Sequence, residues 1–206
     1  MNNLLSILTR EGVLLKTSVR YWRGCKQLKP EDIGLRPGDV SERLVSLGHK
    51  RLLPREATAA LALVESRAHA FVEANTFPFL NGLAHFLPNP RLEEVTTRLR
   101  ELETEFWAAK RNFIATYATL REDALSEWQA MADRVSNDPA RLLATIEASF
   151  PPAPVLERSF GFDVQMFAIS VPERLGLDLV SAADQQSVWQ ARQRAAQEAA
   201  QKIRQD

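Results

Sequence analysis

The sequence predicts a mainly α-helical protein, in which a long antiparallel, coiled-coil-like helical hairpin is joined to a small two-stranded antiparallel sheet. Two observations lead to this fold class. Apolar residues alternate with other residues near each end of the chain, over 12–24 and 160–170, as they do in half-buried strands. The region between these segments has helical periodicity, and residues 91–135 contain neither glycine nor proline.

The two alternating segments predict strands that pair with each other. A lone strand leaves backbone donors and acceptors unpaired, and pairing the two segments satisfies both. We therefore expect these strands to meet across 135 intervening residues and to tie the ends of a helical body together. The period-two positions are Val13, Leu15, Thr17, Val19 and Tyr21 in the first segment and Phe160, Phe162, Val164 and Met166 in the second.

Two long helices are expected, over about 54–74 and 90–135. Pro54 suits a first helical turn, and Asn89 and Pro90 suit an N-cap followed by a first turn. In the second helix an apolar heptad seam runs from Leu92 to Leu120. The phase of the seam then shifts, which bends the packing face or locally unwinds a coiled coil.

The second helix is too long to be covered by the first. At 1.5 Å per residue the two helices span roughly 65 Å and roughly 30 Å. An apolar seam left uncovered on a soluble protein favours a helix from another chain. We therefore expect an oligomer or a complex with a protein partner, with Phe106, Phe113 and Trp128 near the contact.

The segment 75–90 is apolar but is interrupted by Pro78, Gly82 and Pro88. We interpret it as a loop packed over the core, because large apolar patches are rare on soluble monomers. The alternative is a partner-binding surface that includes Phe77 and Phe79.

The expected domain organisation is a helical body with its sheet over 1–178 and a C-terminal helix over 179–206. Shorter helices are expected at 2–9, at 40–47 and after Pro139, and an extended connector at 151–154. The last helix ends without a glycine, proline or capping signal, which favours a helix that continues in a longer protein.

Composition favours a soluble, cytoplasmic protein. The single cysteine, Cys25, excludes an intramolecular disulfide and suits a reducing compartment. No signal peptide and no apolar run of membrane-spanning length is present. The 26 basic and 26 acidic residues cancel, but residues 1–56 hold 11 Lys/Arg against 6 Asp/Glu. This basic bias suits an acidic partner, nucleic acid or the acidic remainder of the same chain.

No pattern of residues predicts catalysis, a metal site or a cofactor. The three histidines, His49, His69 and His85, have no cysteine or histidine at metal-ligand spacing. Glycine-rich phosphate loops and the GxSxG motif are absent. Cys25 lies near Arg23 and Lys26, a setting typical of reactive thiols, but no general base accompanies it. We therefore expect a protein that is not an enzyme.

The segment from Arg20 to Lys29 mixes basic and aromatic residues and is the best candidate for nucleic-acid binding. Its cations could contact phosphates while Trp22 stacks on a base. In the alternative, Tyr21 packs inward, Trp22 covers the sheet edge, and Arg20 and Arg23 face water. The candidate residues are Arg20, Trp22, Arg23, Lys26 and Lys29.

The chain resembles an uncharacterised bacterial and phage family, catalogued as a domain of unknown function. The resemblance is carried by Gly12-Val-Leu, Arg20-Tyr-Trp-Arg-Gly24, 28–34, 75–82, Phe160-Gly-Phe162 and Ser170-Val-Pro-Glu173. It implies a mobile-element setting near MoxR-type AAA ATPases and recombination or replication genes, and it transfers no catalytic residue. The function expected is a non-enzymatic interaction or assembly protein of a mobile genetic element or phage, with an AAA ATPase as its candidate partner. The alternatives are a nucleic-acid-binding accessory protein and a component of a host–phage conflict system.

Overall fold

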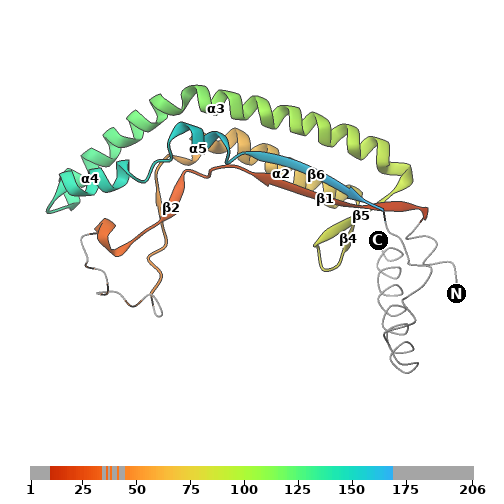
Figure 1. Ribbon diagram of the computed structural model, residues 1–206, viewed down its shortest axis with the longest axis horizontal. Coiled ribbons are helices and arrows are strands. Elements are labelled where there is room, and N and C mark those ends of the chain that lie inside the picture. Colours follow the sequence, from red (N-terminus) through yellow and green to blue (C-terminus); the bar gives the residue numbers. More distant parts are fainter. Residues whose placement is uncertain (1–9, 34–35, 37, 39–40, 42–44, 169–206) are drawn as a thin grey trace. The chain divides into compact units, whose positions relative to one another are not determined.

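The computed structural model describes residues 10–33, 36, 38, 41 and 45–168. The helices expected at 2–9 and 179–206 lie outside these residues. Of the helix expected at 40–47, residues 41 and 45–47 are described, and none of these four is helical. The chain divides into two compact units. Unit 1 comprises Met1–Ser18, Ala68–Glu101 and Asp163–Asp206, and unit 2 comprises Val19–Arg67 and Leu102–Phe162. Figure 1 labels the elements along the chain.

A four-stranded sheet has the strand order β4-β5-β1-β6. Its strands are β1 (Gly12–Arg20), β4 (Phe77–Phe79), β5 (Ala84–Pro88) and β6 (Gly161–Phe167). The predicted pairing of the two terminal segments is confirmed, because β1 and β6 are hydrogen-bonded neighbours in this sheet. On its other side β1 pairs antiparallel with β5, so that Gly12 lies opposite Pro88 and Leu15 opposite His85.

The predicted fold class is wrong, because the protein is not a helical hairpin with only two strands. The sheet of β1 and β6 has two further strands, and a second, two-stranded antiparallel sheet is formed by β2 (Cys25–Gln27) and β3 (His49–Arg51). Each of these additional strands is short, and three of them have only three residues. Strands of that length give no readable period-two pattern.

The segment 75–90 is a β-hairpin rather than the loop that its prolines suggested. Pro78 is tolerated because β4 is the edge of the sheet, where a missing backbone donor costs little. Leu80, Asn81 and Gly82 all adopt the left-handed region (φ 48, 55 and 82°), and they reverse the chain. The same glycine and proline residues that indicated irregular structure therefore build the turn and the edge strand.

The long helices lie close to the predicted ranges. A 3-10 turn (η2, Arg55–Thr58) leads into α2 (Ala59–Asn75), and another (η3, Asn89–Arg91) leads into α3 (Leu92–Val135). The Asp138-Pro139 break is confirmed: α4 (Pro139–Glu147) follows, and the Asp138 carboxylate accepts a hydrogen bond from the Arg141 backbone N–H at 3.1 Å. The connector expected at 151–154 contains the start of a short helix, α5 (Ala153–Glu157).

The seam of α3 is buried by residues of the same chain. In unit 2, the Phe106 ring lies 5.7 Å from Phe162, and the Phe113 ring lies 5.8 Å from Phe160. The Tyr117 hydroxyl donates to the Pro151 carbonyl at 3.0 Å. Strand ends and loops therefore cover the part of the seam that a short helix could not reach. The buried seam residues are Val95 and Leu99 in unit 1 and Leu102, Phe106, Phe113, Tyr117, Ala124 and Ala132 in unit 2.

Among the described residues, no helix is both long enough and apolar enough to cross a bilayer.

Candidate partner-binding pocket

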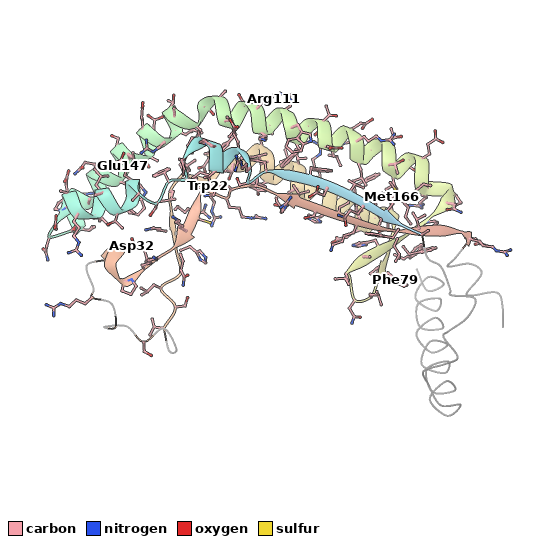
Figure 2. All side chains as sticks on the ribbon, in the orientation of Figure 1. Trp22, Asp32, Phe79, Arg111, Glu147 and Met166 are labelled. Carbon is pink, nitrogen blue, oxygen red and sulfur yellow. The ribbon has the colours of Figure 1, made fainter. Side chains whose placement is uncertain are left out.

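Trp22, the predicted base-stacking residue, packs inside the aromatic cluster of unit 2. Its ring centroid lies 6.4 Å from Phe113, 5.8 Å from Tyr117 and 6.3 Å from Phe150 (Figure 2). These three rings compete with a base for the surface of the indole. Trp22 therefore packs against the protein, although against aromatic rings of unit 2 rather than over the sheet edge that the alternative named.

Arg23 is held by an ion pair. Its guanidinium lies 2.7 Å from the Glu65 carboxylate and 4.9 Å from the centre of the Tyr21 ring. The Tyr21 hydroxyl donates to the other Glu65 oxygen at 3.1 Å. Burial, reinforced by the Glu65 charge, raises the pKa of Tyr21 above its usual value of 10.0, so the phenol stays neutral and can donate this hydrogen bond across the physiological pH range.

The remaining three cations of the predicted nucleic-acid site differ in their surroundings. Arg20 is exposed, and its guanidinium would lie 2.8 Å from a Cβ placed on Gly161. Lys26 and Lys29 are exposed, and their ammonium groups form no ion pair with any described residue. Of this predicted site, the Lys26 and Lys29 ammonium groups therefore remain available to phosphates, whereas the Trp22 ring is packed and is not available to stack on a base.

A buried ion pair fixes the segment that leads into the pocket. The Lys50 ammonium lies 2.6 Å from the Asp32 carboxylate, and the two side chains are only 4% and 2% exposed. Asp32 also accepts the Lys29 backbone N–H at 2.7 Å. Removing one partner of such a pair would strand a buried charge. The pair therefore anchors β3 against η1 (Pro30–Ile33), and Lys50 is not available to a ligand.

The chain that follows β3 is held in turn by Gly24. The backbone N–H groups of Leu52 and Leu53 donate to the Gly24 carbonyl at 2.7 and 3.2 Å. Gly24 has a φ of 64°, and a Cβ there would lie 3.2 Å from the Leu53 Cβ. Glycine is favoured at this position because it accepts the left-handed conformation without strain. Leu52 and Leu53 are almost completely buried as a result.

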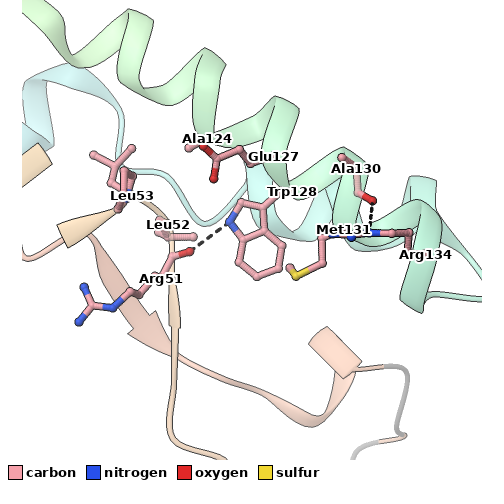
Figure 3. Close-up of a pocket in the computed structure, with 10 residues that line it drawn as sticks. Arg51, Leu52, Leu53, Ala124, Glu127, Trp128, Ala130, Met131 and Arg134 are labelled. Carbon is pink, nitrogen blue, oxygen red and sulfur yellow. Dashed lines mark hydrogen bonds between the residues drawn. The ribbon is translucent and has the colours of Figure 1, made fainter. Parts of the chain in front are cut away.

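The chain from Arg51 to Pro54 forms one wall of an open pocket of about 440 Å³. The other wall is the C-terminal part of α3 (Figure 3). The Trp128 indole N–H donates to the Arg51 carbonyl at 3.1 Å, which fixes the ring between the two walls. Trp128 and Met131 lie side by side on α3 and are partly exposed. The lining residues are Arg51, Leu52, Leu53, Pro54, Ala124, Glu127, Trp128, Ala130, Met131 and Arg134.

Seven of the ten residues that line the pocket are apolar. Its lining contains no serine, threonine, cysteine, histidine or aspartate. The charged groups are Arg51, Glu127 and Arg134, and the Arg134 Nε donates to the Ala130 carbonyl at 3.1 Å. Elsewhere in the described part of the chain, no three His, Cys, Asp or Glu side chains come together as a metal site.

The five predicted partner-binding residues fall into three places. Phe106 and Phe113 are 0% and 4% exposed, so both rings belong to the core of unit 2 and offer no surface to a partner. Phe77 and Phe79 are half-buried on β4. Trp128 lines the pocket. Sequence reasoning missed the other pocket residues; the spacing of Trp128 and Met131, three apart on one helix face, was the available signal.

Together, the fold and the pocket define a protein with both helices and sheets and an open, largely apolar recess. A comparison with known families matched residues 9–206 to the family described as "Protein of unknown function (DUF3150)". The chain belongs to this family, which confirms the resemblance to a family of this kind. No curated protein and no solved structure matched the chain.

Proposed function

We propose that this protein is a non-enzymatic interaction protein, whose Trp128–Met131 pocket binds an apolar side chain from another protein. The observation that carries this proposal is the partly exposed Trp128 ring, held in place at the mouth of an open recess. Tryptophan is strongly enriched among the residues that dominate binding energy at protein interfaces. A ring already fixed by its hydrogen bond to Arg51 loses little further freedom on binding.

The shape and chemistry of the pocket support the same proposal. Its volume of about 440 Å³ falls in the range of sites that bind small molecules or side chains. Leu52, Leu53 and Ala124 supply a rigid, buried floor, and Met131 supplies an adaptable thioether. An aliphatic or aromatic anchor is therefore the group that this pocket suits best.

The first partner to test is an AAA ATPase of the MoxR type, since the family resemblance implies one nearby in the genome. We place this assembly on a mobile genetic element or phage and, because of the single cysteine, in the cytoplasm. Nucleic-acid binding is the second candidate function. The exposed, unpaired Lys26 and Lys29 favour it, whereas the packed Trp22 removes the stacking contribution.

A pair of matched methionine variants tests the proposed function. The tagged wild-type protein, Met131→Lys and Met166→Lys are each co-expressed with the neighbouring ATPase and purified. Met166 lies on β6, is 45% exposed and is not part of the pocket. We expect wild type and Met166→Lys to retain the partner, and Met131→Lys to lose affinity at least about tenfold, which corresponds to about 1.4 kcal/mol.

Circular dichroism of both variants checks that they are folded. Equal retention of the ATPase by Met131→Lys and wild type would contradict a role for the pocket. If the ATPase does not bind at all, the same comparison is made with proteins that co-purify from the native host. The proposal then fails if no such protein is lost by Met131→Lys while Met166→Lys retains it.

A further inference from the structure

We infer that the pocket recognises an acidic segment of its protein partner, in which carboxylates flank one apolar anchor residue. The inference rests on the proposed function and adds the chemistry of the partner. It is carried by the charges at the pocket, where two of the three charged lining residues are arginines and further exposed cations lie close by along the chain.

Four described cations of unit 2 form ion pairs within the unit. Lys50 is paired with Asp32, and Arg23 with Glu65. Arg67 and Glu105 form another pair at 2.6 Å, and Arg121 and Glu147 one at 2.8 Å. By sequence, Val19–Arg67 has ten lysines and arginines against six carboxylates. This segment therefore has a surplus of positive charge.

The surplus lies close to the pocket along the chain. Arg51 lines the pocket, and Arg55 follows directly after the lining residue Pro54. Lys26 lies opposite Lys50 in the β2–β3 register, one position from the Arg51–Cys25 pair. All three side chains are exposed and form no ion pair with a described residue. In Figure 3 the Arg51 guanidinium extends away from the indole, toward the outside of the pocket.

Glu127 opposes this positive charge from the other wall. It is the one carboxylate among the lining residues, and it lies on α3 next to Trp128. Arg134 lies on the same wall. Because like charges repel, the acidic groups of the partner should lie against the arginines and away from Glu127. The apolar anchor would occupy the space over Trp128 and Met131. This arrangement predicts that removing the Glu127 charge strengthens binding.

An acidic peptide fits these features better than a nucleic acid. A phosphate backbone would satisfy the cations, but the floor of leucine, alanine and methionine side chains would contact no matching apolar group. A protein segment supplies both carboxylates and an aliphatic side chain. Charge complementarity of this kind governs partner choice and association rate more than total affinity.

The test uses a short, fluorescently labelled peptide with one central leucine between glutamates. Two matched peptides replace the leucine with serine or all the glutamates with lysines. Binding to the full chain is measured by fluorescence anisotropy at low and at physiological salt. We expect the glutamate–leucine peptide to bind at least about tenfold more tightly than either control, with an affinity that falls as salt rises.

Three variants locate the effect. Arg51→Glu should weaken binding of the glutamate–leucine peptide at least about tenfold, and Glu127→Gln should strengthen it by a few fold. Arg51→Glu keeps the backbone carbonyl that holds Trp128. Arg158→Glu, which makes the same charge change at an exposed site outside the lining, is the matched control and should leave binding within about twofold of wild type.

Several outcomes would overturn the inference. These are equal or tighter binding of the lysine peptide, equal binding of the serine peptide, or equal loss in Arg51→Glu and Arg158→Glu. Tighter binding of a single-stranded DNA of the same charge, lost in Arg51→Glu, would assign the surface to nucleic acid instead. If Met131→Lys releases the native partner while the acidic peptide shows no preference, the proposed function survives and only its acidic specificity fails.

Discussion

Gly12→Ala should destabilise this protein more than the same exchange at any other glycine that the structure describes. Gly12 begins β1, where the chain passes close to β5. A Cβ at this position would overlap the Phe86 ring and would lie 2.5 Å from the Leu87 backbone carbonyl oxygen. The ring has no free space to enter because Phe86 is buried, and the carbonyl is fixed by the sheet. We expect a loss of at least about 3 kcal/mol, at the upper end of the range for overpacked sites.

Chemical denaturation followed by circular dichroism measures this loss, and Gly161→Ala is its control. Gly161 lies on the neighbouring strand β6, where the atoms nearest to a Cβ would be those of the Arg20 guanidinium. A flexible guanidinium can move aside, and alanine also restricts the unfolded chain. The control should change stability by less than about 1 kcal/mol. Similar stability changes in the two variants would contradict the close approach of β1 and β5.

Phe106→Ala should cause the second large loss. The Phe106 ring is fully buried and contacts Trp107, Phe160 and Phe162, with centroid separations of 5.2, 6.5 and 5.7 Å. Removing it leaves a cavity in the aromatic cluster of unit 2, for which we expect a loss of about 3–5 kcal/mol. Phe167, on β6, is 49% exposed, and Phe167→Ala should cost less than about 1 kcal/mol by comparison.

The same pair of variants separates a core residue from an interface residue. The sequence suggested that Phe106 contacts another chain, and truncating an interface ring would dissociate an assembly while leaving each chain folded. The structure predicts the opposite result, in which unfolding occurs at lower denaturant concentration at every protein concentration. A Phe106→Ala variant that keeps the wild-type unfolding midpoint and changes only its sedimentation would show that the ring faces a partner.

Long, strongly patterned elements could be predicted from the sequence. The strand segments 12–24 and 160–170 were recognised by strict alternation, and their pairing followed from the need to satisfy backbone hydrogen bonds. The second long helix was recognised by its heptad seam and its proline boundaries, and α3 runs from Leu92 to Val135. In each case a single pattern of apolar residues extended over many positions and was typical of one type of element, a half-buried strand or a helix with one buried face.

The short strands could not be predicted, because their structure depends on contacts that are distant in sequence. β2 and β3 have three residues each and pair across the 21 residues between Gln27 and His49. Their stability depends partly on the buried Lys50–Asp32 pair, which no periodicity reveals. In the β4–β5 hairpin, Pro78 and Gly82 have the residue types of a loop but the positions of an edge strand and a turn.

The candidate site was only partly accessible to sequence reasoning for the same reason. Trp22 and Trp128 are equally apolar in sequence, and either could have been core or surface. The tertiary structure distinguishes them, since Trp22 meets three aromatic rings whereas Trp128 meets the Arg51 carbonyl beside an open recess. The pocket joins segments 77 residues apart, so its charged rim and its leucine floor could not be combined before the fold was known.

Oxidative footprinting of the protein bound to its partner tests the central proposal most directly. Tryptophan and methionine side chains are readily oxidised when exposed. The chain also has an exposed methionine outside the pocket, which serves as an internal reference. Trp128 and Met131 line the pocket, whereas Met166 is exposed on β6. The pocket proposal predicts that binding protects Trp128 and Met131 from oxidation and leaves Met166 unchanged. Protection of Met166 without any change at Trp128 and Met131 would contradict it.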